Sequence, residues 1–219
     1  MASPAEENYL KALYALDNSM EKISLSDLSK LLKVSLPTSN SMIKKLEGQG
    51  FVNYEKYKPI RLTAKGKKAA AMVLRKHRLT EMYLVEKMGF GWEEVHEIAE
   101  QVEHISSSIF FERMDELMGF PRFDPHGSPI PDKDGKIEAG NFDKLSQCKS
   151  GEKVRIMALS KSSDEFLKYL NSRELNLGII LDIKSKESYD NSMVVSYTDH
   201  PAETLNHIVS EHLLVERIS

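Results

Sequence analysis

The chain has 219 residues, of which 41% are hydrophobic and 29% are charged, the usage of an ordinary globular protein of one or two domains. A single cysteine, Cys148, excludes a framework of internal disulfides, and no apolar run approaches the roughly 20 residues that a membrane span requires. The first residues do not resemble a signal peptide. We therefore expect a soluble, cytoplasmic protein with no membrane partner.

The net charge of −3 conceals a strong asymmetry along the chain. Residues 1–78 hold 15 Lys and Arg against 7 Asp and Glu, a net charge of +8. The remaining residues hold 15 against 26, a net charge of −11. This division predicts that the N-terminal part binds a polyanion and that the C-terminal part binds cations.

The first third of the chain is predicted to be a winged helix-turn-helix. Apolar residues at helical spacing predict helices over 6–17 and 24–32, and Pro37 suits the first turn of a third helix. Two short segments, 51–55 and 60–63, then predict a hairpin. Helix, turn, helix and hairpin in this order are typical of a winged helix.

The middle of the chain is predicted to be helical and its last third to be a small β-barrel. One long helix is expected over 65–88 and a second over 92–118, both apolar enough to offer a pairing surface. The segment 121–135 is rich in Pro and Gly and is therefore predicted to be a loop. Strands are then expected over 152–159, 178–183, 193–197 and 216–218, with a short helix over 165–170.

Histidines and carboxylates gather on the two expected middle helices. They are His77, Glu81, His96, Glu100, Glu103 and His104, with His126 in the loop that follows. Steps of four, three and one residues place the four from His96 to His104 along one helix face. A separate apolar stripe on the same expected helix consists of Val95, Ile98, Val102, Ile105 and Ile109. Imidazoles mixed with carboxylates suit a divalent transition ion such as Mn²⁺, Fe²⁺, Zn²⁺ or Ni²⁺. The alternative is a solvated helix face that carries these residues by chance.

Hydroxyl, amide and basic side chains follow the turn into the third helix. The first turn of a recognition helix faces the bases of the major groove, and basic residues nearby and on a wing meet phosphates. Base contacts are expected from Ser35, Thr38, Ser39, Asn40 and Ser41, and phosphate contacts from Lys44, Lys45, Lys56, Lys58 and Arg61. The alternative is an ordinary N-cap cluster beside a solvated charged face.

Three segments give the chain a resemblance to a known family: 75–81 (RKHRLTE), 95–104 (VHEIAEQVEH) and 124–131 (DPHGSPIP). It resembles the diphtheria-toxin-repressor family of metal-dependent transcriptional regulators, in particular the manganese- and iron-sensing members with a third domain. The resemblance implies a mainly α protein with three domains. They are a winged helix-turn-helix DNA-binding domain (1–75), a helical dimerisation and metal-binding domain (76–143) and an SH3-like C-terminal domain (144–219).

The resemblance also implies a primary regulatory metal site on Asn8, Glu100, Glu103 and His104. Relatives that favour manganese carry an acidic residue in place of Asn8, and Lys11 stands where some relatives supply a carboxylate. Iron sensors typically have Cys in place of Glu100, so the hard oxygen ligands here favour Mn²⁺. Pro37, with Ser35 and Ser41, matches the base-contacting positions of the family.

A second metal site is implied in one of two patterns. One pattern would use His77, Glu81 and His96, and the other would use Glu81, Asp124 and His126. Relatives often have Cys in place of Asp124. Either pattern would be completed by an oxygen from the C-terminal domain, for which Asp164 and Glu165 are the candidates.

The sequence thus predicts a homodimeric repressor, not an enzyme, that binds a double-stranded DNA operator and controls metal-uptake genes. Mn²⁺ or Fe²⁺ would act as corepressor at two sites per subunit. One alternative is a metal-independent winged-helix regulator whose C-terminal half binds a small organic effector. Another is a metal-dependent hydrolase, but the sequence has no phosphate-binding loop, nucleophile elbow or Cys/His pairing for such chemistry.

Overall fold

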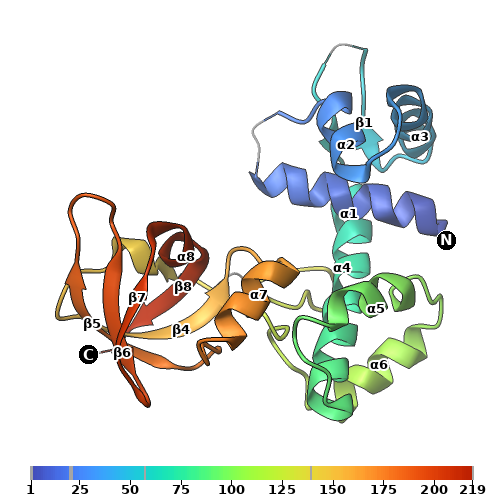
Figure 1. Cartoon of the computed structure of the whole chain (residues 1–219). Helices are drawn as coiled ribbons and strands as arrows, with labels where there is room; N and C mark the ends of the chain where they lie inside the picture. Colours follow the sequence, from blue (N-terminus) through green and yellow to red (C-terminus); the bar gives the residue numbers. More distant parts are fainter. Residues whose placement is uncertain (1, 20–21, 57, 139, 219) are drawn as a thin grey trace. The chain divides into compact units, whose positions relative to one another are not determined.

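The computed structural model describes residues 2–19, 22–56, 58–138 and 140–218 (Figure 1). The chain forms two compact units. The first comprises residues up to Thr80, Glu97–Arg122 and Ile130–Glu138, and the second comprises Glu81–His96, Phe123–Pro129 and the residues from 140 onward. No helix in the described ranges is long and apolar enough to cross a membrane.

The described residues of the N-terminal part of the first unit form three helices and a short hairpin, which can be followed in Figure 1. They are α1 (Pro4–Ser19), α2 (Leu25–Leu32), α3 (Leu36–Gly48), β1 (Val52–Asn53) and β2 (Arg61–Leu62). The two strands pair antiparallel, with Val52 opposite Leu62. Buried Leu10, Leu28 and Ile43 join the three helices in one hydrophobic core. The predicted order of elements is thus present.

Capping residues set the helix-turn-helix. Ser24 caps α2 in a reciprocal capping box with Asp27. Lys33 ends α2 in the left-handed conformation, at φ 53°, and its N–H binds the Lys30 carbonyl. The Ser35 hydroxyl then accepts a hydrogen bond from the Thr38 N–H and starts α3.

Three helices follow, where two long ones were expected. They are α4 (Ala64–Met88), α5 (Val95–Val102) and α6 (Ser108–Leu117). The prediction of one helix over 92–118 is wrong, because the chain extends at Ser107 (φ −75°, ψ 108°) within a run of three serines. Serine hydroxyls compete for backbone hydrogen bonds and favour caps over helix interiors. Glu103 and His104 therefore lie in the turn that ends α5.

The second unit contains a six-stranded antiparallel sheet with the order β3-β8-β4-β5-β6-β7. Its strands are β3 (Asp143–Lys144), β4 (Lys153–Leu159), β5 (Ile180–Lys186), β6 (Met193–Tyr197), β7 (His200–Leu205) and β8 (Leu213–Arg217). A 3₁₀ turn (Leu145–Gln147), α7 (Asp164–Asn171) and α8 (His207–His212) complete it. Across the described residues no pairing joins β3 to β7, so the expected barrel is open at this seam.

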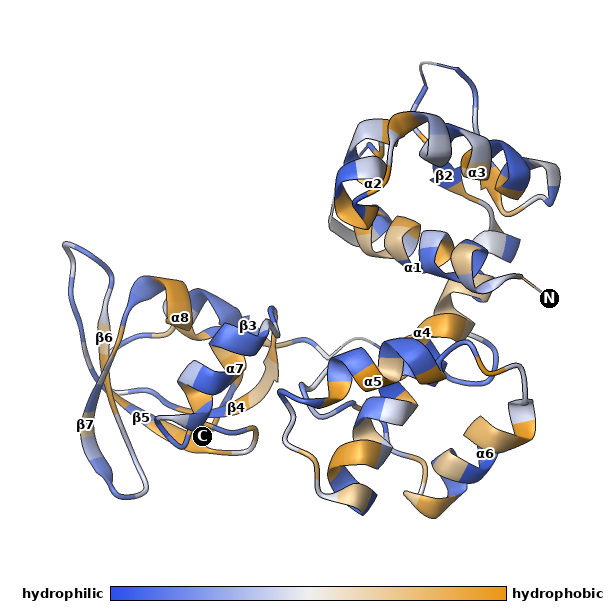
Figure 2. Ribbon diagram, turned by 45° about the vertical axis from the view of Figure 1, so that its right-hand side comes forward, coloured by the Kyte–Doolittle hydropathy of each residue, from blue (hydrophilic) through white to orange (hydrophobic). Residues whose placement is uncertain are grey.

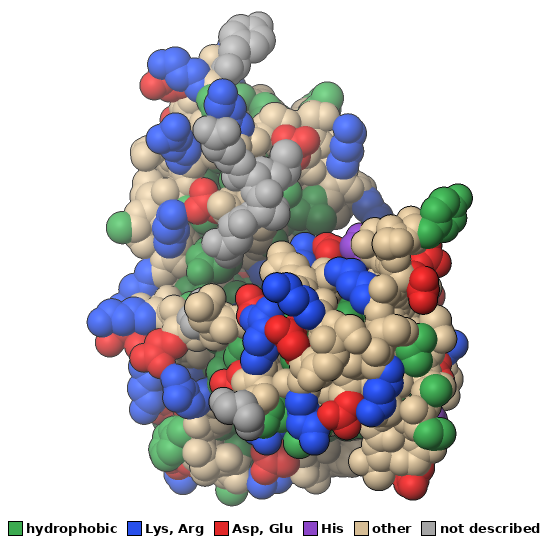
Figure 3. Space-filling view, turned by 90° about the vertical axis from the view of Figure 1, so that its left-hand side faces the viewer, with side chains coloured by type: hydrophobic (Ala, Val, Ile, Leu, Met, Phe, Trp, Pro, Cys, Tyr) green, Lys and Arg blue, Asp and Glu red, His purple; other side chains and the backbone are tan. Residues whose placement is uncertain are grey.

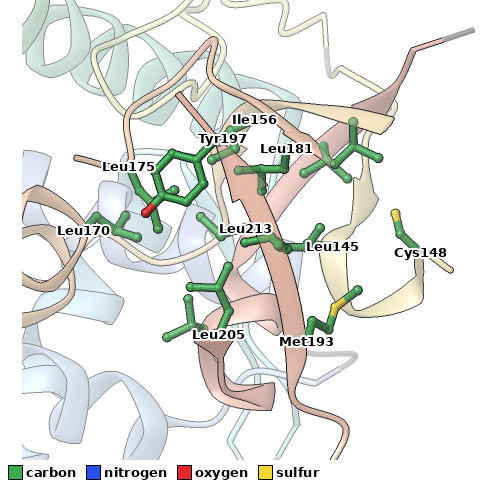
Figure 4. Packing of buried hydrophobic residues seen from close by; sticks show 14 of the residues in the cluster. Leu145, Cys148, Ile156, Leu170, Leu175, Leu181, Met193, Tyr197, Leu205 and Leu213 are labelled. Atoms are coloured by element: carbon green, nitrogen blue, oxygen red, sulfur yellow. The ribbon is translucent and has the colours of Figure 1, made fainter. Parts of the chain in front are cut away.

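One face of this sheet encloses a hydrophobic core (Figure 4). Leu181, Met193 and Leu213 are fully buried there, with Leu170 from α7. Cys148 is buried in the same core as a free thiol. On the face of the molecule drawn in Figure 3, basic and acidic side chains are interspersed and form no patch of a single sign.

Candidate metal centre and nucleic-acid interface

A charged network joins α1 to the end of α5 in the first unit. The Lys11 Nζ lies 2.5 Å from Glu100 Oε1 and 2.7 and 2.8 Å from the two carboxylate oxygens of Glu103. Glu103 is fully buried. A buried carboxylate is costly unless a counter-charge and hydrogen bonds accompany it, and Lys11 supplies both.

Imidazoles complete this network. The Glu103 carboxylate also lies 2.6 Å from His77 Nδ1. His104 Nδ1 lies 2.7 Å from Glu7 Oε2, and its Nε2 lies 3.8 Å from Glu103 Oε1. Lys76 donates to the Glu103 carbonyl at 3.0 Å. The network therefore contains the predicted Glu100, Glu103 and His104 together with Glu7, for which no pattern in the sequence predicts a role at the site.

Asn8 offers a further oxygen on α1. Its Oδ1 is buried and has no hydrogen-bond partner among the described residues. Amide oxygens, carboxylates and imidazole nitrogens are all ligand types that suit a divalent ion, and Asn8 directly follows Glu7 of the network in the sequence. The fit is incomplete, however, because the Lys11 ammonium already holds the two carboxylates that would neutralise such an ion.

A second cluster, formed by Glu81, Asp124 and His126, lies in the second unit. All three residues are buried, and each presents a ligand atom within 4.8 Å of the other two. The His126 Nδ1 lies 3.9 Å from Glu81 Oε2. Three buried ligands that converge in this way fit a divalent cation, which two carboxylates would neutralise.

The Asp124–Ser128 turn positions two of these ligands. Asp124 Oδ1 accepts hydrogen bonds from the N–H groups of His126 and Ser128, both at 2.9 Å. Gly127 has φ +82°, and a Cβ there would lie 2.4 Å from the carbonyl oxygen of Met157 in β4. Glycine is therefore required for the close approach that seats this turn against the sheet.

Hydrogen bonding fixes the His126 tautomer. Its Nε2 lies 2.9 Å from the Trp92 carbonyl oxygen, which only accepts, so Nε2 carries the hydrogen. The Nδ1 atom therefore remains as the ring nitrogen that faces Glu81 and that could bind a cation. A backbone carbonyl that orients a ligand imidazole in this way is common around bound metals.

Of the two patterns predicted for the second metal site, the one that uses Glu81, Asp124 and His126 is the one whose residues form this cluster. In the other pattern, His96 Nδ1 lies 3.3 Å from Glu81 Oε1, while His77 belongs to the Lys11 network. Asp164 and Glu165 begin α7 with exposed side chains, and among the described residues neither joins a ligand cluster. The backbone N–H of Glu165 itself and the Ser163 hydroxyl lower the pKa of the Glu165 carboxyl.

A groove of about 730 Å³ lies between α2, α3 and the hairpin. Asn40 and Lys44 of α3 and Lys56 and Lys58 of the hairpin loop line it. Arg61 lies on β2 with an exposed side chain. Ammonium groups from two elements thus face one concave surface, an arrangement that suits a phosphate backbone.

The predicted α3 residues differ in accessibility. Ser35, Pro37, Thr38 and Ser41 are exposed. Ser39 is fully buried with its hydroxyl 3.4 Å from the Tyr9 hydroxyl, so its expected contact with DNA is not available in this structure. The helical period turns this residue towards α1.

Two further predicted polar residues have partners within the unit. Lys45 is half exposed and lies 3.2 Å from Glu6 Oε1. The Asn40 side-chain oxygen accepts from the Tyr54 hydroxyl at 3.2 Å.

Comparison with known proteins assigns all three parts of the chain. Residues 1–60 match the family model for the iron-dependent repressor N-terminal DNA-binding domain, and residues 63–132 match that for its metal-binding and dimerisation domain. Residues 144–217 match the FeoA domain. The iron-dependent repressor IdeR of Mycobacterium bovis is 30% identical over 69% of each chain, and that of Mycobacterium leprae is 26% identical over 97% of this chain and 96% of its own.

The chain belongs to the iron-dependent repressor family. A solved manganese-dependent transcriptional repressor in complex with manganese superposes with a TM-score of 0.87 at 30% identity, covering 97% of this chain and 99% of that chain. The Zn²⁺-bound repressor ScaR superposes with a TM-score of 0.77, also at 30% identity and with the same coverage. Members of the family are metal-dependent transcriptional repressors, with DNA-binding and metal-binding dimerisation domains.

Proposed function

We propose that this family member is a homodimer that represses metal-uptake genes in the cytoplasm when Mn²⁺ or Fe²⁺ occupies two sites per subunit. The observation that carries the proposal is the buried cluster of Glu81, Asp124 and His126. The other site comprises Asn8, Glu100, Glu103 and His104. Oxygen-rich ligand sets without cysteine favour harder ions, which supports Mn²⁺ or Fe²⁺ over softer alternatives.

A bound divalent ion supplies positive charge and a coordination shell that fixes its ligands. Glu81 contributes from α4 and Asp124 and His126 from the turn seated on β4, so the three ligands fasten that turn to the helix. Asn8 is on α1 and Glu103 follows α5, so the other site would fasten α1 to the end of α5. Metal would raise DNA affinity only if the DNA-binding conformation holds these ligands better than the alternative does.

The DNA contacts are proposed on α3 and the hairpin loop. Ser35, Thr38 and Ser41 are exposed on α3, which supports their assignment as base contacts. Lys44, Lys56 and Lys58 line a groove formed partly by the same helix, which supports their assignment as phosphate contacts.

The dimer surface is proposed on α6 and the residues that flank it. Hydrophobic stretches run along α6 (Figure 2). The side chains of Ile109, Leu117 and Phe120 are 70%, 56% and 60% exposed in the single chain. Large apolar side chains that gather on one exposed element mark a surface for association.

The test is DNA binding as a function of free metal. A duplex selected from a random library in the presence of Mn²⁺ serves as the probe, and fluorescence anisotropy measures its affinity. We expect removal of Mn²⁺ by a chelator to weaken wild-type binding at least about tenfold, a coupling free energy of about 1.4 kcal/mol. His126→Ala should lose most of this dependence, whereas the control His207→Ala, at an exposed position that begins α8, should retain it. Equal affinity with and without metal would contradict the proposal.

A further inference from the structure

We propose that the Lys11 ammonium takes the place of a divalent cation in the first unit and ties α1 to the end of α5 without metal. The inference rests on the proposed function, because it concerns the site assigned there to Asn8, Glu100, Glu103 and His104. It makes the two sites of a subunit unequal. The cluster of Glu81, Asp124 and His126 takes the first ion, and the Lys11 site takes a second ion only when Lys11 leaves.

Distances place the ammonium where an ion would bind. Three carboxylate oxygens of Glu100 and Glu103 lie 2.5–2.8 Å from the Lys11 Nζ. A metal ion held by carboxylate oxygens lies about 2.0–2.2 Å from them, as for Zn²⁺. An ion bound by the same oxygens would therefore occupy the space of the ammonium, and the two cannot be bound together.

The charge balance leads to the same conclusion. Glu7, Glu100 and Glu103 bring three negative charges, and Lys11 and Lys76 bring two positive charges. With neutral imidazoles the network carries a formal charge of −1. A divalent ion added beside Lys11 would reverse this to +1 around the fully buried Glu103, whereas an ion that replaced Lys11 would leave a charge of zero. Displacement of Lys11 is therefore the favourable route for metal entry.

Lys11 also makes the mechanical connection that a bound ion would make. It lies on α1, three residues after Asn8, and its two partners are 89 and 92 residues further along the chain. Its side chain is 20% exposed and that of Glu103 is fully buried, so this ion pair is shielded from solvent, whereas Glu100 is 38% exposed. The metal-free chain thus has α1 already tied to the end of α5.

The first experiment measures Mn²⁺ binding to the full-length protein from the EPR signal of free Mn²⁺. Lys11→Met removes the ammonium and keeps an unbranched side chain, Lys11→Arg keeps the charge, and Lys67→Gln is the matched control. Lys67 also belongs to the first unit and forms a 2.7 Å ion pair, with Asp17. We expect one tight ion and one weak ion in the wild type, Lys11→Arg and Lys67→Gln. In Lys11→Met the weak ion should bind at least about tenfold more tightly, a change of about 1.4 kcal/mol.

The second experiment measures hydrogen exchange of α1 amides in the absence of metal. Wild type and Lys11→Arg should be protected, Lys11→Met should exchange at least about tenfold faster, and Mn²⁺ should restore its protection. Unchanged α1 protection in metal-free Lys11→Met would overturn the inference, as would a Mn²⁺ isotherm identical to that of the wild type.

The inference can be tested even if Lys11→Met does not fold, and its failure can be told apart from failure of the proposed function. If Lys11→Met does not fold, as judged by circular dichroism, the wild-type isotherm still decides, because two ions of equal affinity would overturn the inference. If Mn²⁺ binds as expected but DNA affinity ignores metal, the proposed function fails while the assignment of Lys11 stands. If DNA affinity depends on metal but Lys11→Met binds Mn²⁺ like the wild type, the proposed function stands and the assignment of Lys11 fails.

Discussion

At the scale of single residues, Glu6 illustrates how one carboxylate holds the start of α1. Its side chain is buried and accepts hydrogen bonds from the Ser3 N–H at 2.6 Å and from Gln49 at 2.7 Å, with Lys45 at 3.2 Å. These partners, first among them the Ser3 N–H, lower the pKa of Glu6 to about 2. The ionised form is therefore part of the folded structure.

Glu6→Gln should lower the free energy of unfolding at pH 7 by about 1–2 kcal/mol, the scale of hydrogen bonds to a charged group. Because the folded pKa lies below the unfolded value of about 4.3, the stabilisation is complete above the unfolded pKa and is lost as pH falls towards 2. Calorimetric unfolding of both proteins between pH 7 and pH 3 should show the difference shrinking below about pH 4.5. A difference that is equal at pH 3 and pH 7 would exclude ionisation as its source.

At the scale of elements, the sequence predicted the helices whose ends are set by capping residues next to them in the chain. Ser24 and Ser35 cap α2 and α3, and Pro37 occupies the first turn of α3, so the helix-turn-helix was accessible from the sequence. The prediction of one helix over 92–118 was wrong. Apolar residues at helical spacing on both sides of 103–107 indicated a continuous helix, although three consecutive serines favour a break. In β7 the segment His200–Leu205 is largely polar and contains a proline, so its pairing with β6 has no clear pattern in the sequence.

The two candidate metal sites also combine ligands that the sequence predicted with contacts that it could not predict. The His and Glu spacing on α4 and α5 indicated metal ligands, but the convergence of Glu81 with Asp124 and His126 depends on the fold of an irregular turn. The pairing of Lys11 with Glu103 joins residues 92 positions apart, and no periodicity reports such a contact.

The exposed apolar residues of α6 lead to a prediction about the dimer interface. Ile109→Asp should give a folded monomer, because this side chain is 70% exposed in the single chain and its charge would be buried only against a second copy. Sedimentation velocity measures the mass, and circular dichroism checks the fold. Lys67→Gln, an exposed substitution outside α6, serves as the control. A native dimer of Ile109→Asp would place the interface elsewhere.

At the scale of the whole molecule, the charge asymmetry separates two functions along one chain. Residues 1–78 carry a net charge of +8, and the rest carries −11. DNA binding that releases counterions weakens as salt rises, with a slope proportional to the number of phosphates neutralised. Repulsion between DNA and the acidic C-terminal part favours contact through α3 and the hairpin.

The last prediction tests this division through the salt dependence of DNA affinity at saturating Mn²⁺. Lys44→Gln with Lys58→Gln removes two ammonium groups from the groove, so affinity should fall on selected and random duplexes alike. The slope of log affinity against log salt should become shallower by about 2, roughly one unit for each phosphate that is no longer neutralised. Lys153→Gln with Lys184→Gln removes the same charge from β4 and β5 and should leave the slope unchanged. Equal slopes for both double variants would mean that DNA senses only the total charge and would reject the groove as its binding surface.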